Sequence, residues 1–319
     1  MKLVADIGGT HARFALLDAA GEPAQIQILK TADYSDLAAA MKAYLKMTQA
    51  SALSAVVSIA APLSSDRVRM TNASWDFSIE KTKQEVGLQD LRLVNDFEAL
   101  ALAVPSLQAS ELLAIDHVMP QDALRTKAIL GPGTGLGMAG VMPVIVNGQA
   151  SWHAMPSEGG HASVAPANAR EAALLQAAWD MGCGHVCWED WLSGTGLPLL
   201  HRAVCAVDNL VYQALTPAQL GEAALTHKDV ACRATLATFC ALLGSAAGDL
   251  ALMTGARGGV YIKGGVLDRM LELAPNFLAE STFRERFEAK GAYTSYMQTI
   301  PTWFIQTPQI ALRGCATLL

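Results

Sequence analysis

Charge is scarce in this sequence, and runs of basic residues are absent. Only 16% of the 319 residues are charged, Lys and Arg number 23 against 29 Asp and Glu, and the formal net charge is -6. Binding to nucleic acid requires clustered Lys and Arg that neutralise phosphates. We therefore exclude nucleic acid as the main partner and favour small-molecule chemistry.

The sequence also lacks an export signal, the repeated CxxC spacing of zinc-binding segments and a membrane-spanning stretch. The six cysteines show no repeated CxxC spacing, and Asp6 interrupts the first apolar run before it reaches the length of a leader. The longest uncharged apolar stretch, residues 234–248, is too short to span a bilayer and predicts a core helix. These absences predict a cytoplasmic protein with reduced cysteines that does not bind membranes.

The sequence contains enough hydrophobic residues to form large buried cores. Hydrophobic residues make up 52% of the chain, and 26 glycines allow many tight turns. A chain of 319 residues exceeds what one ordinary core covers, so we predict two lobes. Because no low-complexity run or Pro-rich linker separates the halves, the lobes are expected to form one continuous body.

Hydrophobic periodicity predicts an α/β chain. Three antiparallel strands with short glycine-containing connections are expected at the start, within residues 2–10, 11–21 and 25–31. Helices then alternate with strands up to Pro105. Residues 128–152 predict a second set of hairpins, in which Asn147 and Gly148 form a tight turn. Four helices follow, over residues 168–181, 196–207, 217–226 and 229–254. One more strand is expected at 259–265. The second set of hairpins suggests that the first architecture recurs.

Two glycines follow the first predicted strand. Within residues 6–10 (DIGGT), Gly8 and Gly9 allow backbone amides to approach an anion. Asp6 at the strand end could hold Mg2+ through water, because this ion takes few carboxylates and keeps several waters. The same residues also suit an ordinary hairpin turn.

A second turn rich in glycine occupies residues 133–135 (GTG). It follows a buried strand, and it matches neither the dinucleotide fingerprint nor a P-loop, which requires a Lys after the glycines. Two such turns, one in each half, would hold the phosphates of one nucleotide. The pair predicts nucleotide binding, which neither turn predicts alone.

An Asn-Asp pair lies between a predicted strand and a predicted helix. Asp96 at this place could cap the helix or project toward a ligand. A kinase that acts on an alcohol needs one carboxylate aimed at the attacking hydroxyl and neutral groups that bind the substrate. Asn95 and Asp96 supply both types, so Asp96 is the candidate base.

Three further segments suit ligand contacts. Residues 158–161 (EGGH) combine an acid, flexible backbone and an imidazole, which suits a polyol as well as a surface loop. One Glu and one His make a poor zinc site, so we predict no structural metal. Glu189 stands at a predicted helix start, where a surface charge is ordinary. Gly264 and Gly265 end the last predicted strand, where either an adenine ring or a simple turn fits.

Seven blocks of the sequence resemble the bacterial glucokinase family of the actin-like ATPase superfamily. In order they are VADIGGTHAR, SIAAPLSSDRVRMTNASW, LVNDFEALALAVP, LGPGTGLGMA, SEGGHAS, WLSGTG and GGVYIKGGV. They span residues 4–266, and their number, order and spacing carry a resemblance that no single block would.

The resemblance implies an α/β, two-lobed actin-like ATPase (ribonuclease H-like) fold with a deep interdomain cleft. The implied small domain comprises residues 1–105 plus about 300–319, and the implied large domain residues 106–299. Nucleotide would bind at the cleft floor and sugar between the lobes, with closure excluding water.

Site residues follow from the resemblance, block by block. The implied first phosphate loop consists of Ala5, Asp6, Ile7, Gly8, Gly9 and Thr10. The implied second loop and the border of the adenosine site consist of Gly133, Thr134, Gly135, Gly264 and Gly265. The implied glucose contacts are Asn95, Asp96, Glu158, His161 and Glu189, with Asn72 as a supporting residue. ATP and Mg2+ are the implied cofactors, with the metal held through water by Asp6.

The chain departs from the family pattern at three positions. His11 stands where Asn is usual, Pro132 where a small residue is usual, and Ser157 where Gly is common. These departures bear on nucleotide affinity and donor choice. The related ROK kinases carry a zinc-binding cysteine cluster, and only Cys183 and Cys187 lie near that place, so the branch without zinc fits better.

The combined expectation is a homodimeric glucokinase that uses ATP to phosphorylate the 6-hydroxyl of glucose. Asp96 would accept the hydroxyl proton during in-line transfer. The alternatives are a kinase for another hexose or an amino sugar, and a non-catalytic sugar sensor or actin-like ATPase that works through partner binding.

Overall fold

The computed structural model describes residues 1–61, 63–70, 73–119 and 122–319. The chain divides into two compact units. The first comprises Met1–Leu107, Val144–Pro156 and Thr307–Leu319, and the second Gln108–Pro143 and Ser157–Gln306. The domain boundaries expected from the resemblance stay a prediction. The compact units differ from them at residues 106–107, 144–156 and 300–306.

A five-stranded mixed sheet forms the centre of the first unit, in the order β3-β2-β1-β4-β7. Its strands are β1 (Lys2–Ile7), β2 (His11–Leu17), β3 (Pro23–Lys30), β4 (Ser54–Ile59) and β7 (Asp90–Asn95). The first three are antiparallel, as predicted, while β4 and β7 run parallel to β1. A small antiparallel hairpin adds β5 (Arg67–Arg69) and β6 (Asp76–Ser78).

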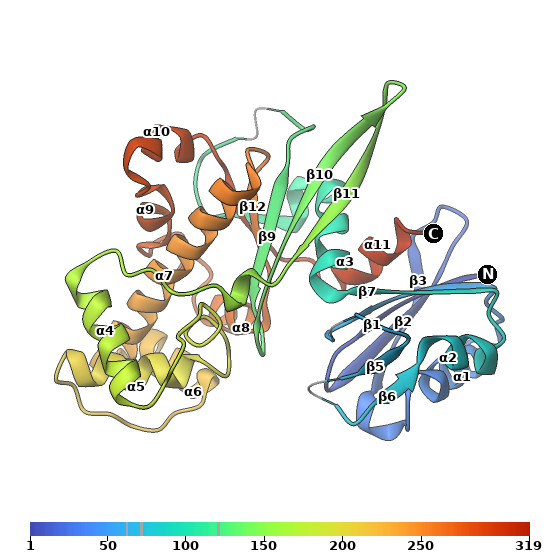
Figure 1. Ribbon diagram of the computed structural model, residues 1–319, viewed down its shortest axis with the longest axis horizontal. Coiled ribbons are helices and arrows are strands. Elements are labelled where there is room, and N and C mark those ends of the chain that lie inside the picture. Colours follow the sequence, from blue (N-terminus) through green and yellow to red (C-terminus); the bar gives the residue numbers. More distant parts are fainter. Residues whose placement is uncertain (62, 71–72, 120–121) are drawn as a thin grey trace. The chain divides into compact units, whose positions relative to one another are not determined.

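Helices cover both faces of this sheet (Figure 1). On one face, α1 (Leu37–Met47) and α2 (Ile79–Val86) pack against the side chains of Leu3, Ala5 and Ile7. On the other, α3 (Asp96–Ala103) and α11 (Ile310–Ala316) pack against Val4 and its neighbours. Alternation of side chains along β1 explains why both faces are apolar. A Cβ on Gly314 of α11 would lie 1.7 Å from the carbonyl oxygen of Ala99 in α3, so these two helices touch backbone to backbone.

A six-stranded sheet forms the centre of the second unit, in the order β11-β10-β9-β12-β13-β8. Its strands are β8 (Leu112–Ala114), β9 (Lys127–Pro132), β10 (Leu136–Val146), β11 (Gln149–Ser157), β12 (Val260–Ile262) and β13 (Thr302–Ile305). As in the first sheet, β9 pairs antiparallel with β10, whereas β12 pairs parallel with β9 and β13. The predicted recurrence of the first architecture is therefore present.

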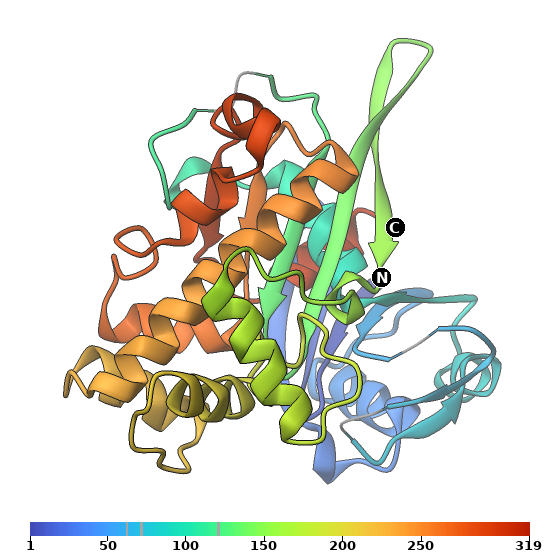
Figure 2. The same cartoon turned by 60° about the vertical axis from the view of Figure 1, so that its left-hand side comes forward.

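Helices dominate the rest of the second unit. They are α4 (Ala169–Asp180), α5 (Leu197–Val207), α6 (Pro217–Leu225), α7 (Val230–Thr254), α8 (Gly265–Leu273), α9 (Phe283–Glu288) and α10 (Thr294–Met297). The first four agree with the predicted helices. The long helix α7, orange in Figure 2, runs through this unit and packs against α5, α6 and α9. Its length and apolar composition would permit a membrane span, but 72% of its most apolar window is buried within the structure, as in a core helix.

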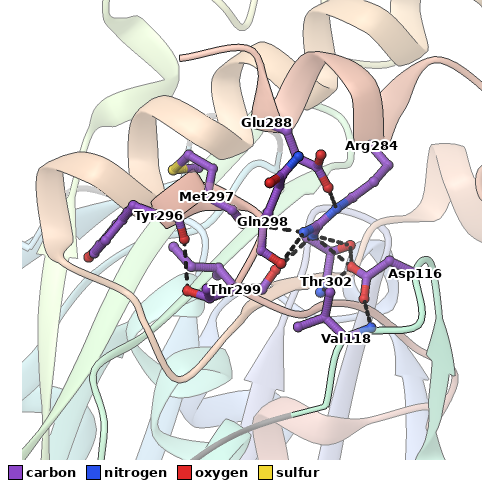
Figure 3. A network of polar contacts seen from close by, with 10 residues as sticks. Asp116, Val118, Arg284, Glu288, Tyr296, Met297, Gln298, Thr299 and Thr302 are labelled. Carbon is purple, nitrogen blue, oxygen red and sulfur yellow. Dashed lines mark hydrogen bonds and ion pairs between the residues drawn. The ribbon is translucent and has the colours of Figure 1, made fainter. Parts of the chain in front are cut away.

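A network of polar contacts fixes the start of β13 (Figure 3). One oxygen of Asp116 accepts hydrogen bonds from the backbone N–H of Thr302 at 2.8 Å and from Nη1 of Arg284 at 2.7 Å. The same guanidinium also donates to the carbonyl oxygen of Ile300 and to Glu288. Because Asp116 and Arg284 are largely buried, their charges satisfy one another and tie α9 to the edge of the second sheet.

Candidate functional site

The carboxyl ends of three parallel strands lie side by side at one edge of the first sheet. Ile7 of β1 pairs with Ile59 of β4, and Ile59 pairs with Asn95 of β7. In open α/β sheets, ligands bind at this edge. The register therefore brings the glycine turn after β1 and the pair Asn95-Asp96 after β7 to one edge of the first unit.

The first glycine turn is held by backbone contacts. The N–H of Gly8 donates to the carbonyl oxygen of His11 at 2.9 Å, and the hydroxyl of Thr31 donates to the carbonyl oxygen of Gly8 at 3.0 Å. The buried side chains of Ala5 and Ile7 belong to the core, so they can offer a ligand only backbone atoms. The side chains of Thr10 and His11 are exposed beside the turn.

Asp6 has two protein partners at the end of β1. One oxygen accepts from the hydroxyl of Ser58 at 2.8 Å, and the other lies 3.1 Å from Nη1 of Arg13. In the described part of the chain, no three or more His, Cys, Asp or Glu side chains come together in a way that could hold a metal. A single carboxylate with partners fits a magnesium ion bound through water, because Mg2+ retains several waters and takes other ligands from phosphates.

The Asn-Asp pair is divided between two roles. The side-chain oxygen of Asn95 accepts hydrogen bonds from the N–H groups of Phe97 at 2.9 Å and Glu98 at 3.3 Å, so Asn95 caps α3. One oxygen of Asp96 accepts from the Phe97 N–H at 3.0 Å. The helix therefore has its cap in the residue before Asp96, and the half-buried Asp96 carboxylate is fixed against the first turn of α3.

The second glycine turn is braced by a segment to which the sequence analysis assigned no role. The N–H of Gly194 donates to the carbonyl oxygen of Gly133 at 2.8 Å. The hydroxyl of Thr195 donates to the carbonyl oxygen of Thr134 at 3.0 Å. The turn is closed by a bond from the Gly133 N–H to the carbonyl oxygen of Gly135 at 2.8 Å. Residues 194–196 thus form another Gly-Thr-Gly turn, which packs directly on the turn of residues 133–135.

Glu189 lies beside the second glycine turn. Its Oε2 accepts a hydrogen bond of 2.7 Å from the N–H of Leu136, the residue after Gly135. Its own N–H donates to the carbonyl oxygen of Gly160 at 2.8 Å. Glu189 therefore touches both the predicted phosphate turn and the predicted sugar loop.

Residues 158–161 form a short helical turn in which Glu158 and His161 are exposed and Gly160 is buried. The N–H of His161 donates to the carbonyl oxygen of Glu158 at 3.0 Å, and the hydroxyl of Ser157 accepts from the Gly159 N–H at 2.9 Å. The departure at Ser157 thus adds a hydrogen bond that fixes the loop. Nδ1 of His161 lies 4.0 Å from Sγ of Cys187, and burial raises the pKa of the Cys187 thiol, so Cys187 stays protonated. The structure brings Glu158, His161 and Glu189 together in the second unit.

A pocket of about 630 Å³ opens beside the second glycine turn. Its walls include Gly133, Thr134 and Gly265, three of the residues predicted to bind nucleotide. Gly264 lies at the back of this region, where a Cβ would come within 2.4 Å of the carbonyl oxygen of Pro132. Gly265 has open space around its Cβ position, so the backbone at the start of α8 is accessible to a flat ligand.

Several lining residues of this pocket were missed by sequence reasoning. They come from the 194–195 turn, the first half of α6 and the exposed side of α8, and they include Gly194, Thr195, Thr216, Pro217, Glu222, Arg269 and Glu272. For the first two, the repeated Gly-Thr-Gly sequence was an available signal. The others carried none, because only tertiary packing brings α6 and α8 to the glycine turn. Asn72, predicted to support the sugar site, lies outside the described residues.

Comparison with known proteins gives consistent matches over the whole chain. A family model described as Glucokinase matches residues 3–319. The glucokinase of Chromobacterium violaceum is 45% identical over 320 residues, covering 100% of this chain and 89% of that protein. A crystal structure of a glucokinase from an Antarctic psychrotroph has a TM-score of 0.86 at 37% identity, and it covers 100% of this chain and 98% of that one.

More distant structures share the fold alone. A ROK family glucokinase from Streptomyces griseus, solved in complex with glucose and AMPPNP, has a TM-score of 0.62 at 19% identity and covers 99% of this chain and 98% of that one. The actin-like ATPase fold predicted from the sequence is confirmed by these neighbours.

Proposed function

Because the chain belongs to the glucokinase family, we propose that it transfers the γ-phosphate of ATP to the 6-hydroxyl of glucose, giving glucose 6-phosphate and ADP. The pocket beside Gly133 and Thr134 carries this proposal. It joins a phosphate-type glycine turn to a cavity large enough for a nucleoside. The related structure with glucose and AMPPNP supports the same pair of substrates.

The proposed roles follow the chemistry of each segment. The backbone N–H groups of residues 8–10 and 133–135 bind phosphate oxygens, and Gly264 and Gly265 border the adenosine. The hydroxyls of glucose are bound by Asn95, Glu158, His161 and Glu189. Charge-assisted and neutral hydrogen bonds of this kind fix the sugar so that one hydroxyl faces the γ-phosphate.

Asp96 is the proposed general base. Its carboxylate accepts the proton of the attacking hydroxyl as the bond to phosphorus forms, and the bond between the γ-phosphorus and the bridging oxygen breaks in line. Asn95 caps the helix, so the cap does not depend on the carboxylate of Asp96. Mg2+, when bound, neutralises the charge on the phosphates. Asp6, whose carboxylate Arg13 and Ser58 hold in place, would be the residue that holds the ion through water.

A comparison of sugars tests the proposed function. We expect ADP formation, followed in a coupled assay, to show the highest kcat/KM with glucose among glucose, mannose, fructose, galactose and N-acetylated sugars. Activity with another sugar and none with glucose would favour the alternative hexose or amino sugar kinase. ATP hydrolysis that does not depend on sugar would favour an actin-like ATPase.

The adenosine pocket gives a second prediction. Replacing Gly265 by Leu places a side chain in the open space beside the pocket, so we expect the KM for ATP to rise by at least about tenfold. The dissociation constant for glucose should change little, because the substitution does not touch residues 158–161 or Glu189. An unchanged KM for ATP in the Gly265→Leu variant would place the adenosine elsewhere.

Three further features belong to the same proposal. We propose that the protein acts as a homodimer in the cytoplasm, with domain boundaries at 1–105 plus about 300–319 and at 106–299. The family resemblance supports these expectations. Sedimentation of the purified protein tests the dimer.

A further inference from the structure

A single carboxylate connects the predicted phosphate turn to the predicted sugar loop. Oε2 of Glu189 accepts the N–H of Leu136 at 2.7 Å, although the two residues are 53 positions apart. This N–H is the first donor after the turn of residues 133–135. A hydrogen bond from a backbone donor to a charged acceptor is about twice as strong as one between neutral groups. The position of the Glu189 carboxylate therefore affects the conformation of the turn.

The contact depends on the absence of a side chain at position 135. A Cβ on Gly135 would lie 2.3 Å from Oε2 and 3.1 Å from Cδ of Glu189. By contrast, a Cβ on Gly133 in the same turn would meet only the carbonyl oxygen of Gly135, at 3.9 Å, which is an ordinary contact. Neither glycine has a positive φ. The two positions thus differ in their room for a methyl group and not in backbone strain.

The backbone of Glu189 is anchored on the sugar side. Its N–H donates to the carbonyl oxygen of Gly160, and the neighbouring Trp188 and Leu192 are buried in the core of the unit. In the part of the chain that the structure describes, Oε1 of Glu189 makes no hydrogen bond. One oxygen thus holds the phosphate turn, and the other remains for a hydroxyl donor of the sugar.

We propose that Glu189 is a positioning residue that couples the binding of the two substrates. A sugar hydroxyl that donates to Oε1 fixes the carboxylate, the fixed carboxylate holds the Leu136 N–H, and the turn of residues 133–135 is then ordered for the ATP phosphates. Coupling of this kind is reciprocal, so ATP strengthens glucose binding by the same factor. The inference rests on the proposed function, because it takes glucose and ATP as the ligands.

Two alanine substitutions in the turn test the contact. Gly135→Ala displaces the Glu189 carboxylate, so we expect the dissociation constant for glucose, measured by calorimetry without nucleotide, to rise by about tenfold. Gly133→Ala is the matched control, and its glucose affinity should stay within about twofold of the wild type. Equal glucose affinities for the Gly135→Ala variant and the wild type would overturn the proposal.

Substitutions of Glu189 test the coupling itself. For the wild type, we expect a non-hydrolysable ATP analogue to tighten glucose binding by about fivefold or more. Glu189→Gln keeps an acceptor for the Leu136 N–H and should keep most of this ratio, whereas Glu189→Ala should bring it close to one. A ratio of one in the wild type, or an undiminished ratio in Glu189→Ala, contradicts the coupling. A wild-type protein that binds glucose without phosphorylating it would instead contradict the proposed function.

Discussion

Replacing Asp96 by Asn is expected to lower kcat for glucose phosphorylation by about 10²–10⁴-fold, because an amide cannot accept the proton of the attacking hydroxyl. The substitution preserves size and hydrogen bonding to the first turn of α3, which Asn95 caps independently. Glucose binding should therefore remain measurable. Steady-state kinetics combined with calorimetric titration of glucose separates the two effects.

Glu98 provides a matched control for this experiment. Glu98 lies on the same first turn of α3, where its carboxylate is 3.7 Å from Nη2 of the half-exposed Arg92. The ion pair is long and its Arg92 partner is half exposed, so it contributes little to stability. We expect Glu98→Gln to retain most of the wild-type turnover. If kcat of Asp96→Asn stayed within about tenfold of the wild type, Asp96 would not be the general base.

Gly314→Ala is expected to destabilise the first unit by about 1–3 kcal/mol. Alanine favours a helix by about 0.5–1 kcal/mol over glycine, but here the methyl group would lie 1.7 Å from the carbonyl oxygen of Ala99. Neither backbone can yield locally, so α11 and α3 must move apart and lose their packing on Val4 and Val94. The free-energy cost of this steric overlap outweighs the gain in helix propensity.

Amide hydrogen exchange of α3 measures this effect in the intact protein. We expect faster exchange over residues 97–103 in Gly314→Ala, together with a lower kcat, since α3 begins with Asp96. Gly184→Ala is the control, because the position is exposed and a Cβ there meets nothing within 4 Å. Unchanged exchange in α3 would show that the helices adjust without loss of packing.

Local sequence patterns predicted most of the regular structure. The first three strands and four of the helices in the second unit carry strong periodicity, and glycine or proline marks many of their ends. Several short elements were not predicted, among them β8, β13, α9 and α10. β13 is four residues long, and its place in the second sheet depends on Asp116 and Arg284, which are distant in sequence. No local pattern encodes such a contact.

The sequence likewise predicted some residues of the candidate site and not others. The glycine turns and the Asn-Asp pair were recognisable because their residue types are unusual where a strand ends. The roles of Glu222 and Arg269 were not, because they reach the pocket only through packing of α6 against α8. The contact between Glu189 and Leu136 was only partly predictable. The family resemblance identified Glu189 as a site residue, but only the structure shows its hydrogen bond beside the phosphate turn.

The first unit cannot cover one face of its sheet fully until residues 310–316 have left the ribosome. Sγ of Cys315 lies 3.6 Å from the carbonyl oxygen of Ala5, although the two residues are 310 positions apart. At about 5–20 residues per second, the apolar face around Val4 waits roughly 15–60 seconds for α11 during synthesis. The second unit ends at Gln306 and is nearly continuous in sequence, so it can fold first. Translation thus favours a folding order in which the first unit, whose strands are synthesised first, finishes folding last. The sheet face that is exposed in the interval is a natural target for chaperones.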